Sequence, residues 1–178
     1  EYIDSIKGEL LKSDYVVMQH EIPAETVEYV VNICYENGIK VVLNPAPARE
    51  VKKEVLDKIT WLTPNEHEAK ILFGADTNTE ELLKTYPEKL VITLGSDGVA
   101  AAKKDGTIVH VPVRPAKVAD TTGAGDTLNG AFCTMLAENA DLESALRFAN
   151  TAASLSTEKF GAQTGMPTCE EVEKELNK

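Results

Sequence analysis

Residues 120–132 read Asp-Thr-Thr-Gly-Ala-Gly-Asp-Thr-Leu-Asn-Gly-Ala-Phe, a glycine-rich turn that runs directly into an amphipathic helix. Gly123 and Gly125 let the backbone approach a ligand closely, and the N–H groups of a first helical turn have no partner inside the helix. Aligned peptide dipoles add about half a positive charge at this end of the helix. The stretch therefore predicts an anion site that needs no lysine side chain.

Asp126 lies in the first turn of this predicted helix, beside the expected anion. A carboxylate next to a phosphate is repelled unless it takes part in the chemistry, for example by accepting the proton of an attacking hydroxyl. The helix dipole makes such a carboxylate a weak base, which phosphoryl transfer tolerates because positioning and charge stabilisation dominate. The alternative is that Asp126 only complements the helix dipole, as acidic residues do at the start of many helices.

Upstream of this turn, short apolar runs alternate with stretches of helical spacing. Such alternation with short connections is typical of a parallel sheet covered by helices. The runs predict buried strands at 15–19, 39–43, 60–63 and 90–94, and helices from Pro23 to Asn37 and at 50–59, 65–73 and 79–85.

The pattern changes after the fourth predicted strand. Lys104-Asp105-Gly106 separates two short apolar runs, at 99–103 and 107–111, and predicts an antiparallel hairpin. Two long helices are expected at 124–138 and 142–159, the second rich in small residues that favour close packing. A capping box, Thr168 with Glu171, predicts the start of a last helix.

Composition narrows the classes of partner. The chain has 178 residues, enough for one domain or a large piece of one, and 43% of them are hydrophobic. A net charge of −11 argues against binding to nucleic acid or an anionic membrane. No apolar run of about 18 residues predicts a membrane span. Because Cys34, Cys133 and Cys169 show no C-x-x-C spacing and Glu1–Ser5 shows no secretory profile, we expect reduced thiols and a cytoplasmic protein.

The order of residues from Asp120 to Phe132 resembles a motif of the ribokinase-like sugar kinases, the phosphofructokinase-B family. The match is long, and other segments match in order over essentially the whole chain. The resemblance implies a Rossmann-like, three-layer αβα fold with a mostly parallel sheet and an antiparallel ribbon. It also implies that Asp126 is the catalytic base on the sugar hydroxyl. The amides of Gly123, Ala124, Gly125 and Asp126 would form an anion hole for the transferring phosphoryl group.

The segment Thr63–Ala69 resembles the N-x-x-E motif of the family. The resemblance implies that Asn65 lies near the phosphates of ATP and that Glu68 organises Mg²⁺ and its waters. An Asn at a helix N-cap with Glu three residues later is also a capping box, and both interpretations can hold together.

The resemblance also assigns contacts to the nucleotide itself. It places Asn150 on the adenine side, for which a helix-packing Asn is the alternative. The resemblance also places four residues around the ribose and phosphates: Thr93, Gly95, Ser96 and Gly98. For these residues, a plain glycine turn is the alternative.

On the sugar side, Met18–Glu21 and Asn44–Arg49 resemble segments of family members that phosphorylate ribose. The resemblance implies that Glu21, at the end of a strand, hydrogen-bonds the sugar; a surface acid is the alternative. Arg49 could contact an anion, but we expect its side chain to be exposed. The three histidines, His20, His67 and His110, lack partners at ligand spacing, and we assign them no role.

The family often binds a monovalent cation beside the anion hole, so the resemblance implies K⁺. Most ligands of that site are backbone carbonyls, for which residue identity is a weak test. Gly165 departs from the pattern, because some members have a side-chain hydroxyl there. The matching residues are Asp120, Thr122, Ser156, Lys159, Gly161 and Gly165.

Two features of the family are missing from this sequence. Its first motif contains a Gly-Gly turn, and the chain has no Gly-Gly dipeptide. The strands of the sugar-covering lid are also absent. We therefore expect residues 1–178 to be the C-terminal nucleotide-binding and catalytic part of a single domain, poorly active alone. Strands 15–19 and 39–43 would then lose neighbours, leaving an exposed sheet edge that is prone to association.

The expected function is an ATP-dependent kinase acting on the primary hydroxyl of D-ribose, with a homodimer as the full-length protein. A family kinase for fructose, deoxyribose or adenosine remains open, as does a non-catalytic nucleotide-binding module. Asp126 argues against the module, since binding alone does not need a carboxylate facing phosphate. A dinucleotide-dependent oxidoreductase is disfavoured because no strand–GxGxxG–helix unit opens the chain.

Overall fold

Three parallel strands form from the apolar runs in the first third of the chain. They are β1 (Tyr15–Gln19), β2 (Lys40–Asn44) and β3 (Trp61–Leu62), in the order β1-β2-β3. Their register places Met18 beside Leu43 and Leu43 beside Leu62. Parallel bridges from Leu62 to Leu90 and from Asn65 to Thr93 continue this arrangement to β4 (Val91–Thr93). The predicted parallel sheet is therefore confirmed.

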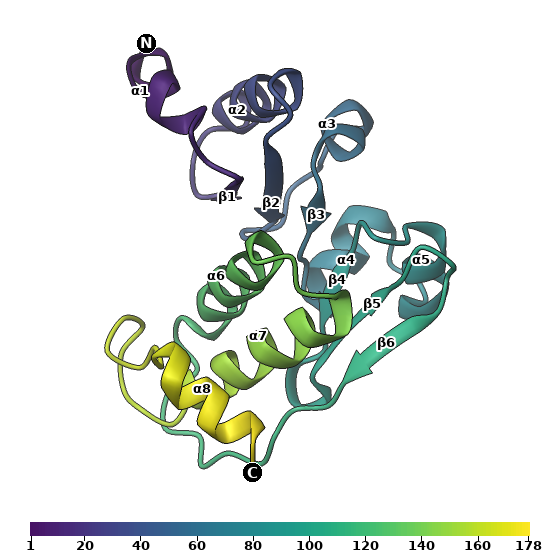
Figure 1. Ribbon diagram of the computed structural model, residues 1–178. Coiled ribbons are helices and arrows are strands. Elements are labelled where there is room, and N and C mark those ends of the chain that lie inside the picture. The colour runs from purple at the N-terminus through teal and green to yellow at the C-terminus, as the bar shows by residue number, and fades with distance from the viewer. The chain divides into compact units, whose positions relative to one another are not determined.

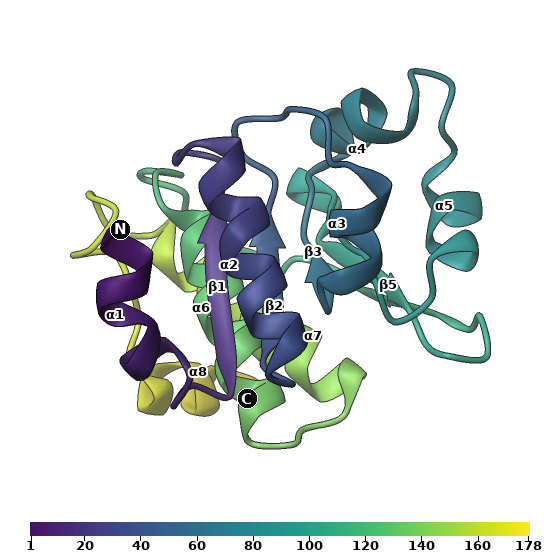
Figure 2. The same ribbon diagram turned by 90° about the horizontal axis from the view of Figure 1, so that it is seen from above.

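The computed structural model describes all of residues 1–178 and divides into two compact units. The first unit comprises residues 1–93 and 101–108, and the second comprises 94–100 and 109–178. In the first unit, α2 (Ala24–Glu36) packs on β2, as Figure 2 shows from above. The other helices of this unit are α1 (Tyr2–Leu10), α3 (Lys53–Lys58), α4 (Glu66–Phe73) and α5 (Thr79–Thr85).

The second sheet is antiparallel and contains β4, β5 (Val99–Ala102) and β6 (Ile108–Val111). The predicted turn Lys104-Asp105-Gly106 joins β5 to β6, and the carboxylate of Asp105 accepts a hydrogen bond from the Thr107 amide at 2.9 Å. A short 3-10 helix, η1 (Gly95–Asp97), lies between β4 and β5. Figure 1 shows the hairpin of β5 and β6.

Three helices form the core of the second unit: α6 (Ala124–Ala137), α7 (Leu142–Ser156) and α8 (Cys169–Leu176). The middle helix, α7, contacts both α6 and α8 (Figure 1). Its small residues Ala145, Ala149 and Ala152 are buried, which allows the close packing that the sequence predicts. Phe132 of α6 is fully buried, and burial of such a side chain stabilises the fold by about 1.5–3 kcal/mol.

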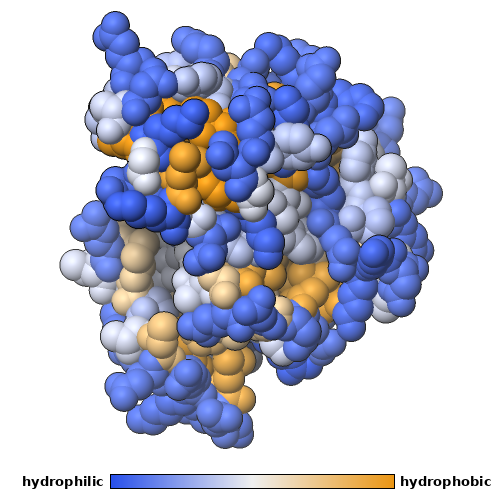
Figure 3. All heavy atoms as spheres, turned by 45° about the horizontal axis from the view of Figure 1, so that its top comes forward, coloured by the Kyte–Doolittle hydropathy of each residue, from blue (hydrophilic) through white to orange (hydrophobic).

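The edge strand β1 is only partly covered. Val17, in the middle of the strand, is 44% exposed, whereas Val42 at the matching position of β2 is fully buried. Hydrophobic residues reach the face drawn in Figure 3 in separate areas between hydrophilic side chains. No helix combines the length and apolar character needed to cross a bilayer.

Candidate functional site

The glycine-rich turn leads into α6 through a left-handed residue, Gly123, whose φ is +81°. A Cβ atom at this position would lie 2.9 Å from both Cα and Cβ of Ala162, in the loop that follows α7. No side chain fits there without displacing backbone atoms, and the positive φ adds strain to any other residue. Gly123 is therefore required both by the turn and by the contact with Ala162.

The amides of this turn are only partly used by the protein. The Ala124 amide donates to the Thr121 carbonyl at 3.2 Å, and the Thr127 amide donates to the Gly123 carbonyl at 2.9 Å. The Gly125 amide has no acceptor within the protein and is exposed at the start of α6. The start of α6 thus presents at least this N–H group and the positive end of the helix dipole to a ligand.

The Asp126 side chain lies on the surface and not in the core. It lines a groove of about 270 Å³ formed by α6, α7, α8 and the chain before α8. The groove is mostly apolar, and Asp126 is the only charged residue among those that line it. Besides Asp126, the lining includes Thr127, Ala131, Phe148, Ala152, Met166, Cys169 and Val172.

Asp120 connects the glycine turn to the loop after α7. One carboxylate oxygen, Oδ1, accepts from the Thr122 amide at 2.9 Å, and Oδ2 accepts from the Gly161 amide at 2.9 Å. The Thr122 side chain contributes most to lowering the pKa of Asp120 below its usual range, and the Gly161 and Thr122 amides lower it further. The carboxylate therefore orders the two segments by binding an amide in each of them.

Three backbone carbonyl oxygens converge beside Gly165. A Cβ atom there would lie 2.7 Å from the Ser156 oxygen, 2.9 Å from that of Gly161 and 3.4 Å from that of Lys159. The hydroxyl of Ser156 donates to the Ala153 carbonyl at 2.7 Å, and Nζ of Lys159 pairs with Glu171 at 3.4 Å. Their side chains are thus occupied elsewhere, so Ser156 and Lys159 could serve a cation only through carbonyls.

The turn from Gly95 to Gly98 and the side chain of Asn150 meet at the end of β6. A Cβ atom on Gly98, whose φ is +98°, would lie 2.0 Å from the Val111 carbonyl oxygen. The buried Asn150 donates Nδ2 to the carbonyls of Val111 and Pro112, at 3.3 and 3.0 Å. Gly98 and Asn150 therefore both lie against the Val111–Pro112 backbone. Ser96, on the same turn as Gly98, is exposed.

In the first unit, Asn65 and Glu68 form the capping box of α4. The Glu68 amide donates to Asn65 Oδ1 at 2.8 Å, and the Asn65 amide donates to Glu68 Oε2 at 2.8 Å. Thr93 lies on the neighbouring strand end, and its amide donates to the Pro64 carbonyl at 3.1 Å. The structural interpretation of the motif is therefore confirmed, and Asn65, Glu68 and Thr93 lie together at one edge of the sheet.

Glu21 follows the end of β1 and is exposed. The loop Asn44–Arg49 lies next to it: the His20 amide donates to the Ala46 carbonyl at 2.9 Å. Arg49 Nη2 donates to the Ile22 carbonyl at 2.8 Å. Arg49 is therefore half-buried and bound, where an exposed side chain was expected.

The candidate residues thus form more than one group in each unit. The first unit brings Asn65, Glu68 and Thr93 together and carries Glu21 at another strand end. The second unit joins the anion turn to the carbonyl loop through Asp120. Sequence reasoning missed Ala162 and the apolar lining of the groove, because neither carries a local pattern.

Comparisons with known proteins agree with this geometry. The structure of Arabidopsis thaliana ribokinase complexed with ribose and ATP has a TM-score of 0.87 at 31% identity, covering 97% of this chain and 58% of that one. The Thermotoga maritima ribokinase has a TM-score of 0.84 at 34% identity, covering 96% of this chain and 59% of that one. The fold is therefore the ribokinase-like α/β fold.

Sequence relatives identify the family. A model of the pfkB family carbohydrate kinases matches residues 3–169. Ribokinase of Bacillus subtilis is 54% identical over 168 residues, which cover 93% of this chain and 56% of that protein. Ribokinase of Lactococcus lactis is 47% identical over 176 residues, covering 98% and 58%. The chain belongs to the pfkB family of carbohydrate kinases, and it spans little more than half the length of these relatives.

Proposed function

We propose that this chain carries the nucleotide-binding and catalytic part of an ATP-dependent kinase that phosphorylates the primary hydroxyl of D-ribose. One observation supports the chemistry above all others. An exposed carboxylate, Asp126, and the unpaired amide of Gly125 occupy the same first turn of α6. The names of the relatives support ribose as the sugar, since those of Bacillus subtilis and Lactococcus lactis are ribokinases.

In the proposed reaction, Asp126 accepts the proton of the sugar hydroxyl as its oxygen attacks the γ-phosphorus of ATP. The bond from that phosphorus to the bridging oxygen breaks, and ADP leaves with the electron pair. The Gly125 amide and the dipole of α6 stabilise the negative charge on the equatorial oxygens. Asp126 and this amide share a rigid helix start, so their spacing is fixed before the substrate arrives.

Asn65, Glu68 and Thr93 are proposed to lie at the phosphates of ATP. The carboxylate of Glu68 keeps acceptor capacity beyond its capping bond and fits a water-mediated Mg²⁺ site, where the ion would neutralise phosphate charge. The turn of Gly95, Ser96 and Gly98 is proposed to receive the ribose and phosphates. Asn150 is proposed to act on the adenine side by ordering the Val111–Pro112 backbone.

The carbonyls of Ser156, Lys159 and Gly161 fit a monovalent cation, because neutral carbonyl oxygens are suitable ligands for hard cations. Asp120, Thr122 and Gly165 complete the proposed K⁺ site. The cation would fix the loop that touches Gly123 and thereby the anion turn.

Gly165→Ala tests this proposed cation site. The added methyl group would lie 2.7 Å from the Ser156 carbonyl oxygen and would spread the three carbonyls. We expect the variant to lose most of the activation by K⁺, measured as kcat with and without K⁺ at constant ionic strength. Gly8→Ala is the matched control, since Gly8, like Gly165, has no positive φ, but its Cβ would meet no atom within 4 Å. Undiminished activation in Gly165→Ala would contradict the K⁺ assignment.

We further propose that the sugar-binding part and lid of the enzyme lie outside residues 1–178. The chain contains no Gly-Gly turn and matches 56% of the Bacillus subtilis relative. The isolated chain is then expected to turn over ribose poorly, and the full-length protein is proposed to be a cytoplasmic homodimer.

The function is tested by assaying the full-length gene product with ATP and Mg²⁺ against ribose, deoxyribose, fructose and adenosine. We expect the highest kcat/KM with ribose and 5-phosphorylated product. A preference for another acceptor would identify a different kinase of the family. ATP binding without turnover of any acceptor would instead support a nucleotide-binding module and contradict the proposal.

A further inference from the structure

His20, the residue between the end of β1 and Glu21, is unusual because its imidazole is buried. The side chain is 5% exposed, and its Nδ1 atom has no hydrogen-bond partner. The carbonyls of Pro45 and Pro47 lie near the ring, but neither has hydrogen-bond geometry to Nδ1. Burying a polar atom without a partner is costly, so the ring is not explained by simple packing.

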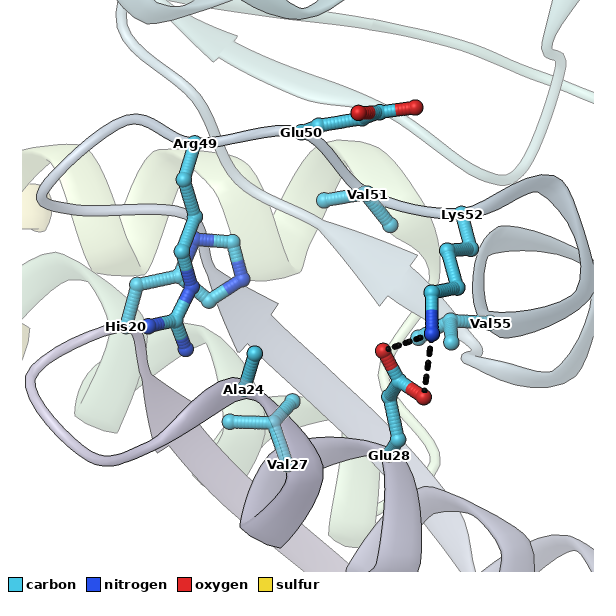
Figure 4. A pocket seen from close by; sticks show the side chains of 9 residues that line it. All are labelled: His20, Ala24, Val27, Glu28, Arg49, Glu50, Val51, Lys52 and Val55. Carbon is cyan, nitrogen blue, oxygen red and sulfur yellow. Dashed lines mark hydrogen bonds and ion pairs between the residues drawn. The ribbon is translucent and has the colours of Figure 1, made fainter.

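The ring lies at a small cavity between the loop after β2 and the start of α2 (Figure 4). Its volume of about 20 Å³ has room for a single water molecule. Ala24, Val27 and Val55 form the apolar wall. Beside the imidazole, this cavity therefore holds little more than one water molecule.

Four charged groups face this cavity. Arg49 comes from the loop and lies beside the ring (Figure 4). Lys52, just before α3, forms an ion pair of 2.8 Å with Glu28 of α2. Glu50 is exposed at the rim. Because Lys52 already neutralises Glu28, the unbalanced charge nearest the ring is the Arg49 guanidinium.

This environment opposes protonation of the ring. Burial lowers the pKa of His20 most, the charge of Arg49 lowers it further, and the carbonyls of Pro47 and Pro45 offset part of the shift. Protonation would place a second cation beside Arg49, where the cavity has room for only about one water molecule. A movement of the ring or of the loop would reduce this repulsion between the two cations.

The same backbone connects the ring to the sugar side. The His20 amide donates a hydrogen bond to the Ala46 carbonyl, and Arg49 donates one to the Ile22 carbonyl. The loop is therefore bonded to the chain on both sides of Glu21. We propose that His20 is a positioning residue: its neutral ring supports the Asn44–Arg49 loop and holds Glu21 in the sugar-binding position, and protonation releases both. The link to sugar binding rests on the function proposed above.

The direction of the pH effect follows from the lowered pKa. An unfolded chain protonates His20 near its ordinary pKa of about 6.5, whereas the folded chain does so only at lower pH. Between these two values the unfolded state binds more protons, so stability falls as the pH drops through this window. Above the ordinary pKa, His20 has no effect on the pH dependence.

The first test is independent of catalysis and uses NMR on the full-length gene product. The His20 Cε1–H signal and the backbone amides of His20, Glu21 and Arg49 are followed between pH 8 and pH 5. We expect the amides to shift with the midpoint of the His20 ring. In Arg49→Gln the midpoint should move upward, since the neighbouring charge is gone. Amides that do not follow the ring, or an unmoved midpoint, would overturn the coupling.

The second test measures ribose kinetics of the full-length gene product at saturating MgATP. Below the His20 midpoint, KM for ribose should rise about tenfold per pH unit, because only the neutral fraction is competent to bind. KM for ATP should show no such rise. In His20→Leu, which keeps an apolar side chain at all pH values, the rise in ribose KM should disappear.

The two tests separate the possible failures. Coupled NMR signals with a flat ribose KM in an active kinase would overturn the role in sugar binding. The same acid rise of KM in His20→Leu would overturn it as well. If the full-length protein phosphorylates no sugar, the proposed function fails, and the NMR titration alone decides whether His20 positions Glu21.

Discussion

Replacing Asp126 by Asn is expected to lower kcat for ribose phosphorylation by about 10²–10⁴-fold, the usual contribution of a general base. Asn has nearly the same shape as Asp and cannot accept the proton. The residue is exposed in the first turn of α6, so the fold should tolerate the change. Affinity for ATP should stay within about threefold, because the phosphates lose a nearby negative charge and no contact. Steady-state kinetics and calorimetric titration with a non-hydrolysable ATP analogue measure the two effects.

Asp105→Asn is the matched control for this substitution. Asp105 is exposed in the turn between β5 and β6, and Asn is equally suited to such a turn. Its kcat should equal that of the unmodified protein. Ribose phosphorylation by Asp126→Asn at a near-normal rate would show that another group accepts the proton, and the assignment of the base would then be wrong.

The elements with a strong periodic pattern could be predicted closely from the sequence. The capping box of Thr168 and Glu171 correctly placed the start of α8, and Gly74 ends α4 as expected. Elements held mainly by tertiary contacts were less well predicted. The helix expected at 50–59 covers only Lys53–Lys58, and α7 ends at Ser156, three residues early. The first helix, α1, was not predicted, although its partly buried residues Ile3, Ile6 and Leu10 have helical spacing; none of its residues is fully buried.

In the candidate site, too, local features could be predicted from the sequence, whereas contacts between distant residues could not. The Asn65–Glu68 capping box and the glycine turn are local features, and the sequence predicts both. The sequence could not show that the Asn150 amide binds the end of β6, since its partners are about 40 residues away. His20 was given no role for a related reason. Its burial depends on a loop more than 20 residues later, and a lone histidine carries no pattern that reveals this.

Gly123→Ala is expected to lower kcat by about 10²–10³-fold, the loss seen when one anion-hole donor is removed. The new methyl group would meet the Ala162 backbone at 2.9–3.0 Å, at a residue whose φ is +81°. The turn must then shift, and the Gly125 amide moves with it while Asp126 stays on the helix. The strain should also destabilise the fold by about 1–3 kcal/mol, which thermal unfolding measures.

Gly8→Ala is the control that distinguishes a change in the geometry of the Gly123 turn from a general effect of adding a methyl group. Gly8 lies inside α1, where a Cβ would meet no atom within 4 Å, so the change should stabilise the protein by about 0.5–1 kcal/mol and leave kcat unchanged. Because Ala162 belongs to the loop that carries the proposed K⁺ ligands, Gly123→Ala should also raise the K⁺ concentration needed for half-maximal activity. If Gly123→Ala is destabilised as expected but retains its kcat and its K⁺ response, the turn matters for folding only, and the phosphoryl group must be bound elsewhere.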